Sequence, residues 1–218
     1  MLKHLILLEV SMTKKLAILG ASGHGKVVAE IAELCGYSVE FFDDAYPSKR
    51  TLEHWPVLGD TEALLRLVSE YSGVAVGIGN NTIRQQKFML LLEKGINCPV
   101  LVHPLASISH YSHLALGTVV MSGATINPFV EIGKGVIINT NATIDHDCVI
   151  GDYAHVCPGV SIGGGCSVER STWIGIGSAV KQDIKIGESS IIGAGSVVVR
   201  DIQAGVTAFG NPAKVRKV

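Results

Sequence analysis

The sequence has few aromatic residues and almost no excess of charge of either sign. Of its 218 residues only 6% are Phe, Trp or Tyr, and the 18 Lys and Arg nearly balance the 19 Asp and Glu, which leaves a net charge of -1. A chain without a basic excess has no polybasic surface for nucleic acid or anionic lipid. No uncharged apolar run approaches the ~20 residues of a membrane span. We therefore expect neither a nucleic-acid partner nor membrane insertion.

The sequence also lacks paired cysteines. Its five cysteines are scattered, and they form neither a CxxC pair nor a Cys/His spacing that would hold zinc. Such a pattern is typical of reduced thiols, so we expect a cytoplasmic protein without a metal or redox cofactor. Residues 1–10 include Leu2 and the apolar run 5–8, but this run is too short for a signal peptide and no small-residue cleavage site follows. We interpret them as an extended start, with the structured part beginning at Met12.

The second half contains a repeat of six residues. From Ile108 to Val198, every sixth residue is a branched aliphatic one, at sixteen positions without a miss. The residue four places further on is never aromatic or charged, and Gly often comes one place after the aliphatic residue, as at Gly133 and Gly151. A helix repeats its apolar face every 3.6 residues and cannot use a strict period of six. The period is typical of a parallel β-helix.

In such a β-helix, each hexad forms one short strand and one corner. Three hexads complete a triangular coil, so we expect about five coils, with every aliphatic residue stacked on the equivalent residue of the next coil. Gly and Asn would supply corner conformations that are costly for other residues. No insertion interrupts the repeat, so we expect any active site to lie on the surface of the prism or between prisms.

The first half shows alternating strand and helix patterns. Short apolar runs predict strands over residues 15–19, 39–42, 74–78 and 99–102, and helical spacing predicts helices over residues 26–35, 60–71 and 82–94. The first strand leads into Gly20–Gly25 (GASGHG), and the second ends in Asp43 and Asp44. A strand, a Gly-rich turn, a helix and a strand with a terminal acid are the opening of a nucleotide-binding unit.

The Gly-rich turn is a weak signal by itself, because a tight turn without a ligand would have the same residues. Its backbone N–H groups at a helix start would suit a phosphate. With only four strands, we interpret this part as a nucleotide-sugar-binding unit rather than a redox domain. For Asn80, Asn81 and Arg84 the alternatives of ligand contact, helix capping and surface charge stay open.

Together these motifs resemble the hexapeptide-repeat sugar acyltransferases of the sialic-acid O-acetyltransferase type, and most closely the bacterial UDP-4-amino-sugar N-acetyltransferases of the bacillosamine pathway. The resemblance covers nearly the whole chain from Met12. It rests on the GASGHG turn, on residues 42–44 (FDD), on residues 144–151 (IDHDCVIG) and on the final residues 210–214 (GNPAK). It implies an α/β Rossmann-like domain over residues 12–104, followed by an all-β left-handed parallel β-helix over residues 105–218.

The resemblance also implies the chemistry and its residues. His146 would be the general base and Asp147 would increase its basicity, although neighbouring strand residues point to opposite faces, so their contact requires a corner. Acetyl-CoA would be the co-substrate, without a metal, and the active site would lie between the subunits of a homotrimer. The cofactor-binding residues would be His155, Gly164, Ile176 and Ala194, with the amides of residues 163–165 facing the thioester. The substrate-binding residues would be Ser22, Gly23, His24, Asp43, Asp44 and Gly79.

The expected reaction is transfer of an acetyl group to the 4-amino group of a nucleotide-linked, UDP-linked by preference, 4-amino-4,6-dideoxy sugar in bacterial glycan biosynthesis. The alternative is O-acetylation of sialic acid or a related sugar. A silent scaffold that kept only the β-helix is disfavoured by His146 between two acids. Asp43 and Asp44 would accept hydrogen bonds from the base or the ribose, and more than one base would suit them.

Overall fold

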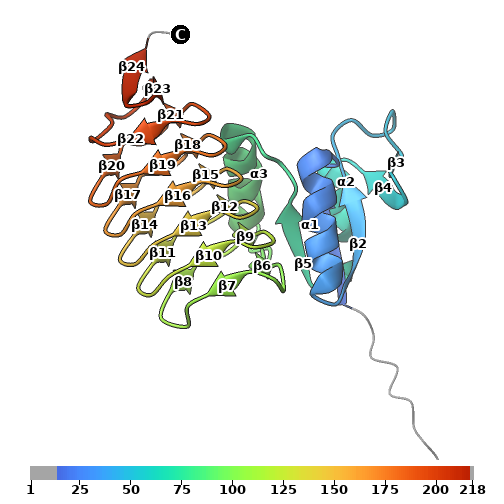
Figure 1. Cartoon of the computed structure of the whole chain (residues 1–218). Helices are drawn as coiled ribbons and strands as arrows, with labels where there is room; N and C mark the ends of the chain where they lie inside the picture. Colours follow the sequence, from blue (N-terminus) through green and yellow to red (C-terminus); the bar gives the residue numbers. More distant parts are fainter. Residues whose placement is uncertain (1–13, 217–218) are drawn as a thin grey trace, which may run out of the picture.

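The computed structural model of the chain describes residues 14–216. Residues 1–10 and the expected start at Met12 lie outside this range. Figure 1 shows an α/β unit beside a tall prism of stacked coils, with the C-terminal end at the top of the prism. None of the described helices is long and apolar enough to cross a membrane.

The α/β unit is built on a five-stranded sheet in the order β3-β4-β2-β1-β5, in which only the β3–β4 pair is antiparallel. Its strands are β1 (Lys14–Leu19), β2 (Tyr37–Phe42), β3 (Thr51–Leu52), β4 (Trp55–Gly59) and β5 (Gly73–Val76). The β3–β4 hairpin was not expected, because β3 is only two residues long and Pro56 interrupts the strand pattern of β4.

The helices lie close to the predicted ranges. They are α1 (Gly23–Leu34), α2 (Thr61–Leu67), the short 3-10 helix η1 (Val68–Glu70) and α3 (Asn81–Glu93). The side chain of Asp60 caps α2 by accepting a hydrogen bond from the Ala63 amide at 2.8 Å, and Asn80 caps α3 by accepting from the Ile83 amide at 3.0 Å. Capping is therefore the structural role of Asn80.

The prism has three flat faces of parallel two-residue strands, named here after their lowest strand. The β7 face consists of β7 (Ser107–Ile108), β10 (Thr125–Ile126), β13 (Thr143–Ile144), β16 (Ser161–Ile162), β19 (Ala179–Val180) and β22 (Val197–Val198). The β8 face consists of β8 (His113–Leu114), β11 (Glu131–Ile132), β14 (Val149–Ile150), β17 (Ser167–Val168) and β20 (Lys185–Ile186). The β6 face consists of β6 (Leu101–Val102), β9 (Val119–Val120), β12 (Ile137–Ile138), β15 (His155–Val156), β18 (Trp173–Ile174) and β21 (Ile191–Ile192).

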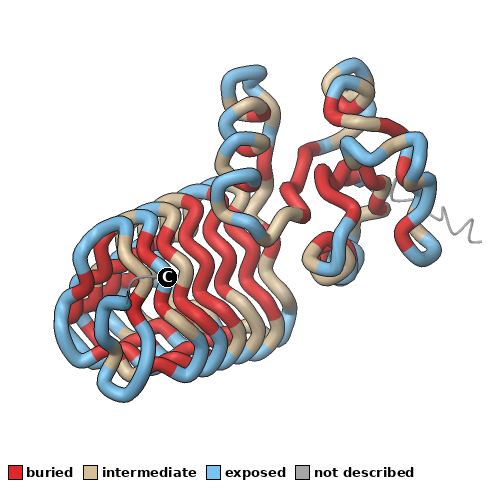
Figure 2. Tube along the Cα trace, turned by 90° about the horizontal axis from the view of Figure 1, so that it is seen from above, coloured by how far each residue is buried: buried red, intermediate tan, exposed pale blue. Residues whose placement is uncertain are grey.

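The strands pair with a register of eighteen residues, as the hexads predicted. Thr125 pairs with Thr143 and Ile126 with Ile144, for example. The aliphatic residues point inward and form one continuous core, and only the lowest, such as Ile108, are partly exposed. Figure 2 shows the buried segments repeating from coil to coil along the prism. The left-handed β-helix with its N-terminal α/β unit is thus confirmed.

Two details of the sequence interpretation were wrong. The strand expected over residues 99–102 does not join the α/β sheet, because β6 pairs with β9 and opens the prism. The glycines that follow the aliphatic residues are not the corner residues. A Cβ on Gly151 would lie 2.6 Å from the Arg170 nitrogen, so these glycines are required by the close approach of the next coil.

The corner conformation falls two residues later in each hexad. Positive φ recurs every six residues from Gly117 to Gly195, and half of these positions are not glycine. Asn141 and Asp147 tolerate it because a short polar side chain lowers the cost of a left-handed backbone. The prism ends in a hairpin of β23 (Thr207–Gly210), which is parallel to β21, and β24 (Ala213–Arg216), which is antiparallel to β23.

A buried arginine joins the α/β unit to the prism. The side chain of Arg84 on α3 is 2% exposed, and its nitrogens donate to the carbonyl oxygens of Gly79 at 2.7 Å, Gly135 at 2.8 Å and Tyr153 at 2.6 Å. Among the described residues it has no carboxylate partner. Of the alternatives that the sequence leaves open for Arg84, surface charge is therefore excluded. Its neighbour Asn81 donates to the Ser171 carbonyl at 3.0 Å and adds a second tie to the prism.

We expect Arg84→Ala to lower the free energy of unfolding by about 2–4 kcal/mol, because several buried carbonyl groups lose their donor at once. Chemical denaturation followed by circular dichroism measures this change. Arg66→Ala, which removes an exposed arginine from α2, is the matched control and should change stability by less than about 0.5 kcal/mol. Equal stability of the two variants would contradict the role of Arg84 as a tie between the two parts.

Candidate active site

His146 lies at the corner between the β7 and β8 faces, where the chain turns from β13 to β14. Asp147 has a φ of 58°, which turns its carboxylate back to the preceding ring, and its Oδ2 lies 2.7 Å from Nδ1 of His146. This corner supplies the geometry that the expected contact required. Nδ1 donates to Asp147, so Nε2 has its lone pair free.

The charges around His146 favour its protonated form. The hydrogen bond to Asp147 and the charge of Asp145 raise the pKa of His146 above its usual value. Asp145 is held in place by Asn127, which donates to its Oδ1 at 2.8 Å and lowers its pKa. His146 is therefore a stronger base than an isolated imidazole, with acids on both sides.

A cleft of about 530 Å³ opens in front of His146. Asp145, Asp147, Gln182, Asp183 and residues 163–165 complete its lining. The sequence interpretation did not identify Gln182 and Asp183, because only the coil register reveals that residues eighteen places apart share one corner. The cleft is open to solvent and large enough for a thioester and an attacking amine.

Gly164 lies against the ring of His146. A Cβ on Gly164 would be 2.7 Å from both Cε1 and Nε2 of the imidazole, so only glycine leaves the ring in place. The neighbouring amides do not form the expected row of free donors. The Gly163 amide donates to the Val180 carbonyl and the Gly165 amide donates to the His146 carbonyl, each at 2.9 Å. The three-glycine segment thus shapes the site around the imidazole.

A second pair of histidines lies where the α/β unit meets the β6 face. His24 at the start of α1 and His155 on β15 have ring centroids 6.3 Å apart, and Trp173 packs against His155 at 4.3 Å. The amide nitrogen of Asn139 lies 3.0 Å from Nε2 of His155 and can only donate, so the proton of His155 is on Nδ1.

Each of these two histidines has one buried nitrogen without a hydrogen-bond partner, Nε2 in His24 and Nδ1 in His155. Burial and then the positive charge of Arg84 lower the pKa of His24 to about 4 and that of His155 to about 3. Both rings are therefore neutral near pH 7. A buried N–H without a partner has the capacity to donate one hydrogen bond to an acceptor oxygen.

A pocket of about 210 Å³ lies at the carboxyl ends of β1 and β2, where parallel α/β sheets bind nucleotides. Ser22, Asp43 and Asp44 line it, as expected. Asp43 accepts from the amides of Ala21 at 2.7 Å and Ala45 at 2.9 Å, so its oxygens already hold the Gly-rich turn. Asp44 is the more exposed of the two carboxylates, although its oxygens also accept hydrogen bonds, from Thr61 and Lys87.

Lys87 on α3 also lines this pocket, and the sequence interpretation missed it. Its ammonium donates to Oδ2 of Asp44 at 2.6 Å and to Oγ1 of Thr61 at 2.8 Å. Partial burial opposes the ionisation of Asp44, but hydrogen bonds from Lys87 and Thr61 to its carboxylate lower its pKa to about 2. Lys87 lies in the middle of α3, and the sequence gave no sign of its role because lysines on helices are usually solvated.

The remaining site residues lie on the β6 side. Ile176 is exposed at the corner between the β6 and β7 faces, and Ala194 is one coil above it. The Gly79 carbonyl accepts from Arg84, and Gly23 begins α1. The structure thus brings the predicted residues together in two groups of one chain: His146, Asp147 and Gly164 at one corner, and the others in the α/β unit and on the β6 side of the prism.

Comparisons with known proteins agree with this architecture. A family model described as the PglD N-terminal domain matches residues 15–91. A comparison with curated protein sequences gives no match. The solved acetyltransferase domain of PglB from Neisseria gonorrhoeae, in complex with acetyl coenzyme A, is 38% identical, with a TM-score of 0.90, and the match covers 94% of this chain and 100% of that one.

Two further solved structures are similar over nearly the whole chain. PerB from Caulobacter crescentus, in complex with CoA and GDP-perosamine, is 37% identical, with a TM-score of 0.89 and coverage of 93% of this chain and 97% of that one. WeeI from Acinetobacter baumannii is 29% identical, with a TM-score of 0.83 and coverage of 92% and 99%. The likeness therefore includes both the α/β unit and the prism.

We expect the three site histidines to titrate separately. His146 should titrate above the usual pKa of about 6.5, while His24 and His155 should stay neutral well below it. In Asp147→Asn, the pKa of His146 should fall, because the hydrogen bond and the charge that stabilise the imidazolium are lost. NMR titration of the ring protons measures all three. A His146 pKa that does not move in Asp147→Asn would contradict the assigned contact.

Proposed function

Because this chain belongs to the PglD-type hexapeptide-repeat sugar N-acetyltransferases, we propose that it transfers the acetyl group of acetyl-CoA to the 4-amino group of a UDP-linked 4-amino-4,6-dideoxy sugar in bacterial glycan biosynthesis. The observation that carries the proposal is the 2.7 Å contact of His146 and Asp147 in an open cleft. Acetyl-CoA-dependent N-acetylation of nucleotide-linked amino sugars is the activity of the family. No observation favours O-acetylation.

His146 takes the proton of the attacking amine at Nε2. As the sugar nitrogen forms its bond to the thioester carbonyl carbon, it gains positive charge, and loss of its proton prevents reversal. Asp147 stabilises the resulting imidazolium through Nδ1. When the bond from carbon to sulfur breaks, the imidazolium returns the proton to the departing CoA thiolate. The products are the N-acetyl sugar and CoA, and His146 is neutral again.

The acetyl donor, acetyl-CoA, fits the residues on the β6 side of the prism. His155 Nδ1–H is a buried donor that suits the thioester oxygen, and the charge of Arg84 behind it would stabilise negative charge on that oxygen. Ile176 and Ala194, one coil apart on the neighbouring corner, offer an exposed apolar edge along which the CoA arm would lie. This arrangement supports His155, Ile176 and Ala194 as donor-binding residues.

The nucleotide sugar fits the pocket at the carboxyl ends of β1 and β2. The N-terminal turn of α1 with Ser22, Gly23 and His24 would hold the diphosphate through backbone N–H groups. Asp44 would accept from the base, and Gly79 borders the sugar end beside His155. The segment that matches the PglD N-terminal domain model contains this whole pocket, and this supports it as the nucleotide-sugar site. The preference for UDP rests on the resemblance of the sequence to UDP-4-amino-sugar N-acetyltransferases.

The separation of the two groups supports a homotrimer with the active site between subunits. The α/β unit covers the β6 face, while His146 lies at the opposite corner, with the packed prism between them. A second copy must therefore bring its His146 corner to the His24–His155 side of the first. This contact joins different surfaces, and three such contacts close a ring. A cytoplasmic location, where acetyl-CoA is available, belongs to the same proposal.

A thiol-release assay with acetyl-CoA and UDP-, dTDP- and GDP-linked 4-amino sugars tests the acceptor. We expect the highest kcat/KM with the UDP-linked sugar, and a loss of about a hundred- to ten-thousand-fold in His146→Ala with its assembly unchanged. Unaltered turnover in His146→Ala would remove the base from the mechanism. CoA release stimulated only by free sialic acid would show that a nucleotide-linked amino sugar is not the acceptor.

Mixing two inactive variants tests the shared active site. His146→Ala and His155→Asn should each be nearly inactive alone, whereas co-refolded mixtures should recover about a quarter of wild-type activity, because random pairing restores one intact site in four. Native mass spectrometry confirms that mixed assemblies form. Mixed assemblies without recovered activity would show that both histidines act from one chain. Co-refolded His146→Ala and Asp147→Asn, which alter the same corner, should not recover and serve as the control.

A further inference from the structure

Three exposed rings stack at the corner that carries His146, in the coils below it. The ring centroids of His110 and Tyr111 are 3.8 Å apart, and those of Tyr111 and Phe129 are 5.3 Å apart with an interplanar angle of 26°. Phe129 lies in the coil directly beneath Asp147, whose amide donates to the Pro128 carbonyl. We name His110, Tyr111 and Phe129 the aromatic ladder. In a chain with few aromatics, a row of them in water needs a reason.

Phe129 occupies one of the left-handed corner positions, with a φ of 62°. The other large residue in that recurring position is Tyr153, with a φ of 59°. Tyr153 is 6% exposed and packs edge-to-face on Phe88 of α3 at 5.8 Å, so packing against the α/β unit offsets its strained backbone. Phe129 is 60% exposed, and its ring partner within the described chain is Tyr111, which is itself exposed. Its left-handed backbone is therefore not offset by burial within the chain, which points to a contact outside it.

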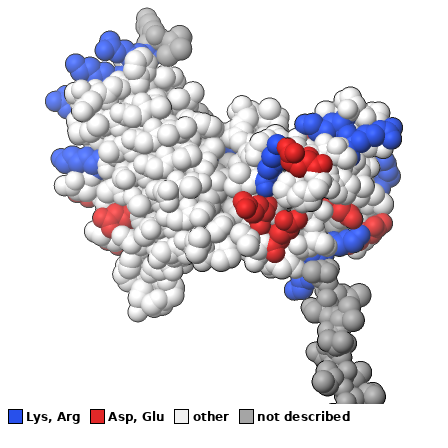
Figure 3. All heavy atoms as spheres, turned by 45° about the vertical axis from the view of Figure 1, so that its right-hand side comes forward, with Lys and Arg blue, Asp and Glu red and all other residues white. Residues whose placement is uncertain are grey.

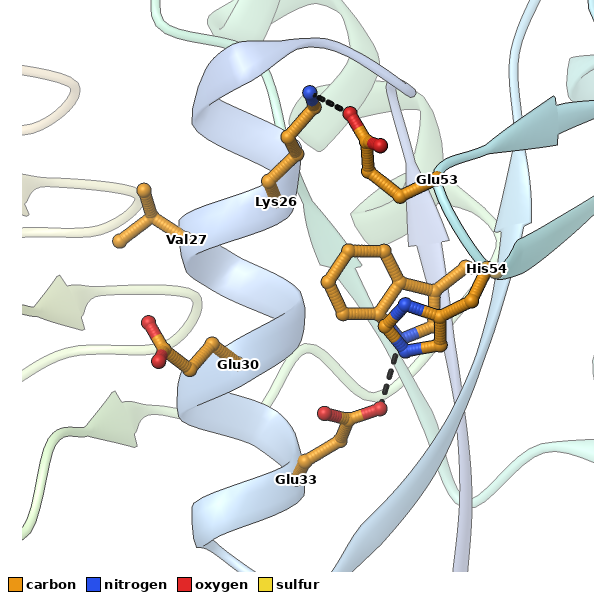
Figure 4. Close-up of a pocket in the computed structure, with 7 residues that line it drawn as sticks. Lys26, Val27, Glu30, Glu33, Glu53 and His54 are labelled. Carbon is orange, nitrogen blue, oxygen red and sulfur yellow. Dashed lines mark hydrogen bonds and ion pairs between the residues drawn. The ribbon is translucent and has the colours of Figure 1, made fainter.

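The opposite side of the molecule offers a matching surface on α1. Figure 4 shows the side chains of Val27 and Glu30 on the side of α1 toward the coils of the prism. Val27 is half-buried against the core of its own chain, and both residues line an open cleft of about 480 Å³ together with His54 and Trp55 of the β3–β4 hairpin. Glu30 is exposed and makes no ion pair or hydrogen bond among the described residues. Figure 3 shows that the visible prism surface beside this domain carries few charges.

Helix α1 runs beside the prism in roughly the direction in which the coils stack, although the stack leans away from the helix toward its upper end (Figure 1). It begins with His24 beside His155 and ends with Cys35, whose sulfur donates to the Val102 carbonyl at 3.3 Å. Eleven residues of helix rise about 16 Å, and the three coils from His155 down to β6 span about 14 Å. About three helix residues therefore correspond to one coil.

The relation of about three helix residues to one coil indicates which residues of two neighbouring copies lie at the same height. In the proposed active site, His146 of one copy lies level with His24 of the next. Phe129 is one coil below His146, which is the level of Val27, and Tyr111 is two coils below, which is the level of Glu30. The levels match provided that the prisms stand side by side with parallel axes.

We propose that the aromatic ladder is a subunit contact: Phe129 packs on Val27 of a second copy, and the Tyr111 hydroxyl donates to the Glu30 carboxylate of that copy. This proposal rests on the proposed function, because the active site places His146 of one copy level with His24 of the next, and this sets the height at which the two copies meet. The contact covers the exposed rings, satisfies a free carboxylate and sets the height at which His146 meets the other subunit. Phe129 and Tyr111 are thus positioning residues, one and two coils from the chemistry.

Disulfide trapping tests the pairing directly. In a Cys35→Ser background, Val27→Cys with Phe129→Cys, and Glu30→Cys with Tyr111→Cys, should form crosslinked dimers and trimers on oxidation that reducing agent dissolves. Val27→Cys with Val149→Cys is the matched control, because Val149 is exposed on the flat β8 face. Trimers that form without either crosslink, or with the control crosslink instead, would overturn the proposal.

Phe129→Gly gives a second readout that a purely structural role would not produce. Glycine relieves the left-handed backbone, so the unfolding midpoint of the dissociated chain should stay the same or rise. Dissociation of the assembly, measured by sedimentation, should become easier by at least about tenfold. Tyr153→Gly is the matched control, and it should destabilise the chain because it removes packing on Phe88. A Phe129→Gly protein that assembles normally, with only its KM for the amino sugar raised, would assign the ladder to the substrate instead.

The trapping experiment needs no substrate, which separates the two proposals. Crosslinks in a protein that acetylates no nucleotide sugar would support the subunit contact and contradict the proposed function. Acetyl transfer by trimers that form neither crosslink would support the function and contradict the contact.

Discussion

The coil of eighteen residues is the constraint on which the rest of the structure depends. Backbone groups of each hexad bond to the hexads eighteen residues before and after, so every residue has a fixed neighbour directly above and below it. Inward positions become columns of aliphatic side chains, and corners become columns of left-handed residues. The place of a functional side chain is therefore set by two things: its position within the coil, which it shares with residues eighteen places away, and the coil in which it lies. Gly164 touches the ring of His146 for this reason, although eighteen residues separate them.

The second organising element is the buried charge of Arg84. Carbonyl dipoles rather than a carboxylate surround its guanidinium, so its positive field is not cancelled locally. The same side chain holds α3 on the prism and lowers the pKa of both His24 and His155. The two histidine groups of the site consequently have opposite electrostatics: acids surround His146, and a cation lies behind His155. A base and a neutral hydrogen-bond donor can thus operate at the same pH.

The sequence predicted those features that repeat or that follow local rules. The hexad period gave the prism and its register, and the spacing of strand, turn and helix gave most of the α/β unit. His146 and Asp147 were identified because acids flank a histidine in a known motif. Lys87, Gln182 and Asp183 were missed, since each reaches its site through the fold and not through neighbours in sequence. The role of Arg84 stayed open, because a charged residue on a helix is normally solvated and only the docking of two units buries it.

The hairpin at the top of the prism has a consequence for self-association. A stack of parallel strands ends in a row of open backbone donors and acceptors, to which another copy could add as it does in a growing amyloid fibre. Here β24 folds back antiparallel on β23, so the last strand runs in the wrong direction for a further coil. Its exposed Lys214 and Arg216 add like charges to that edge. The upper end of the β6 face is thus closed to a further parallel strand, so this edge cannot serve as a template for a second copy.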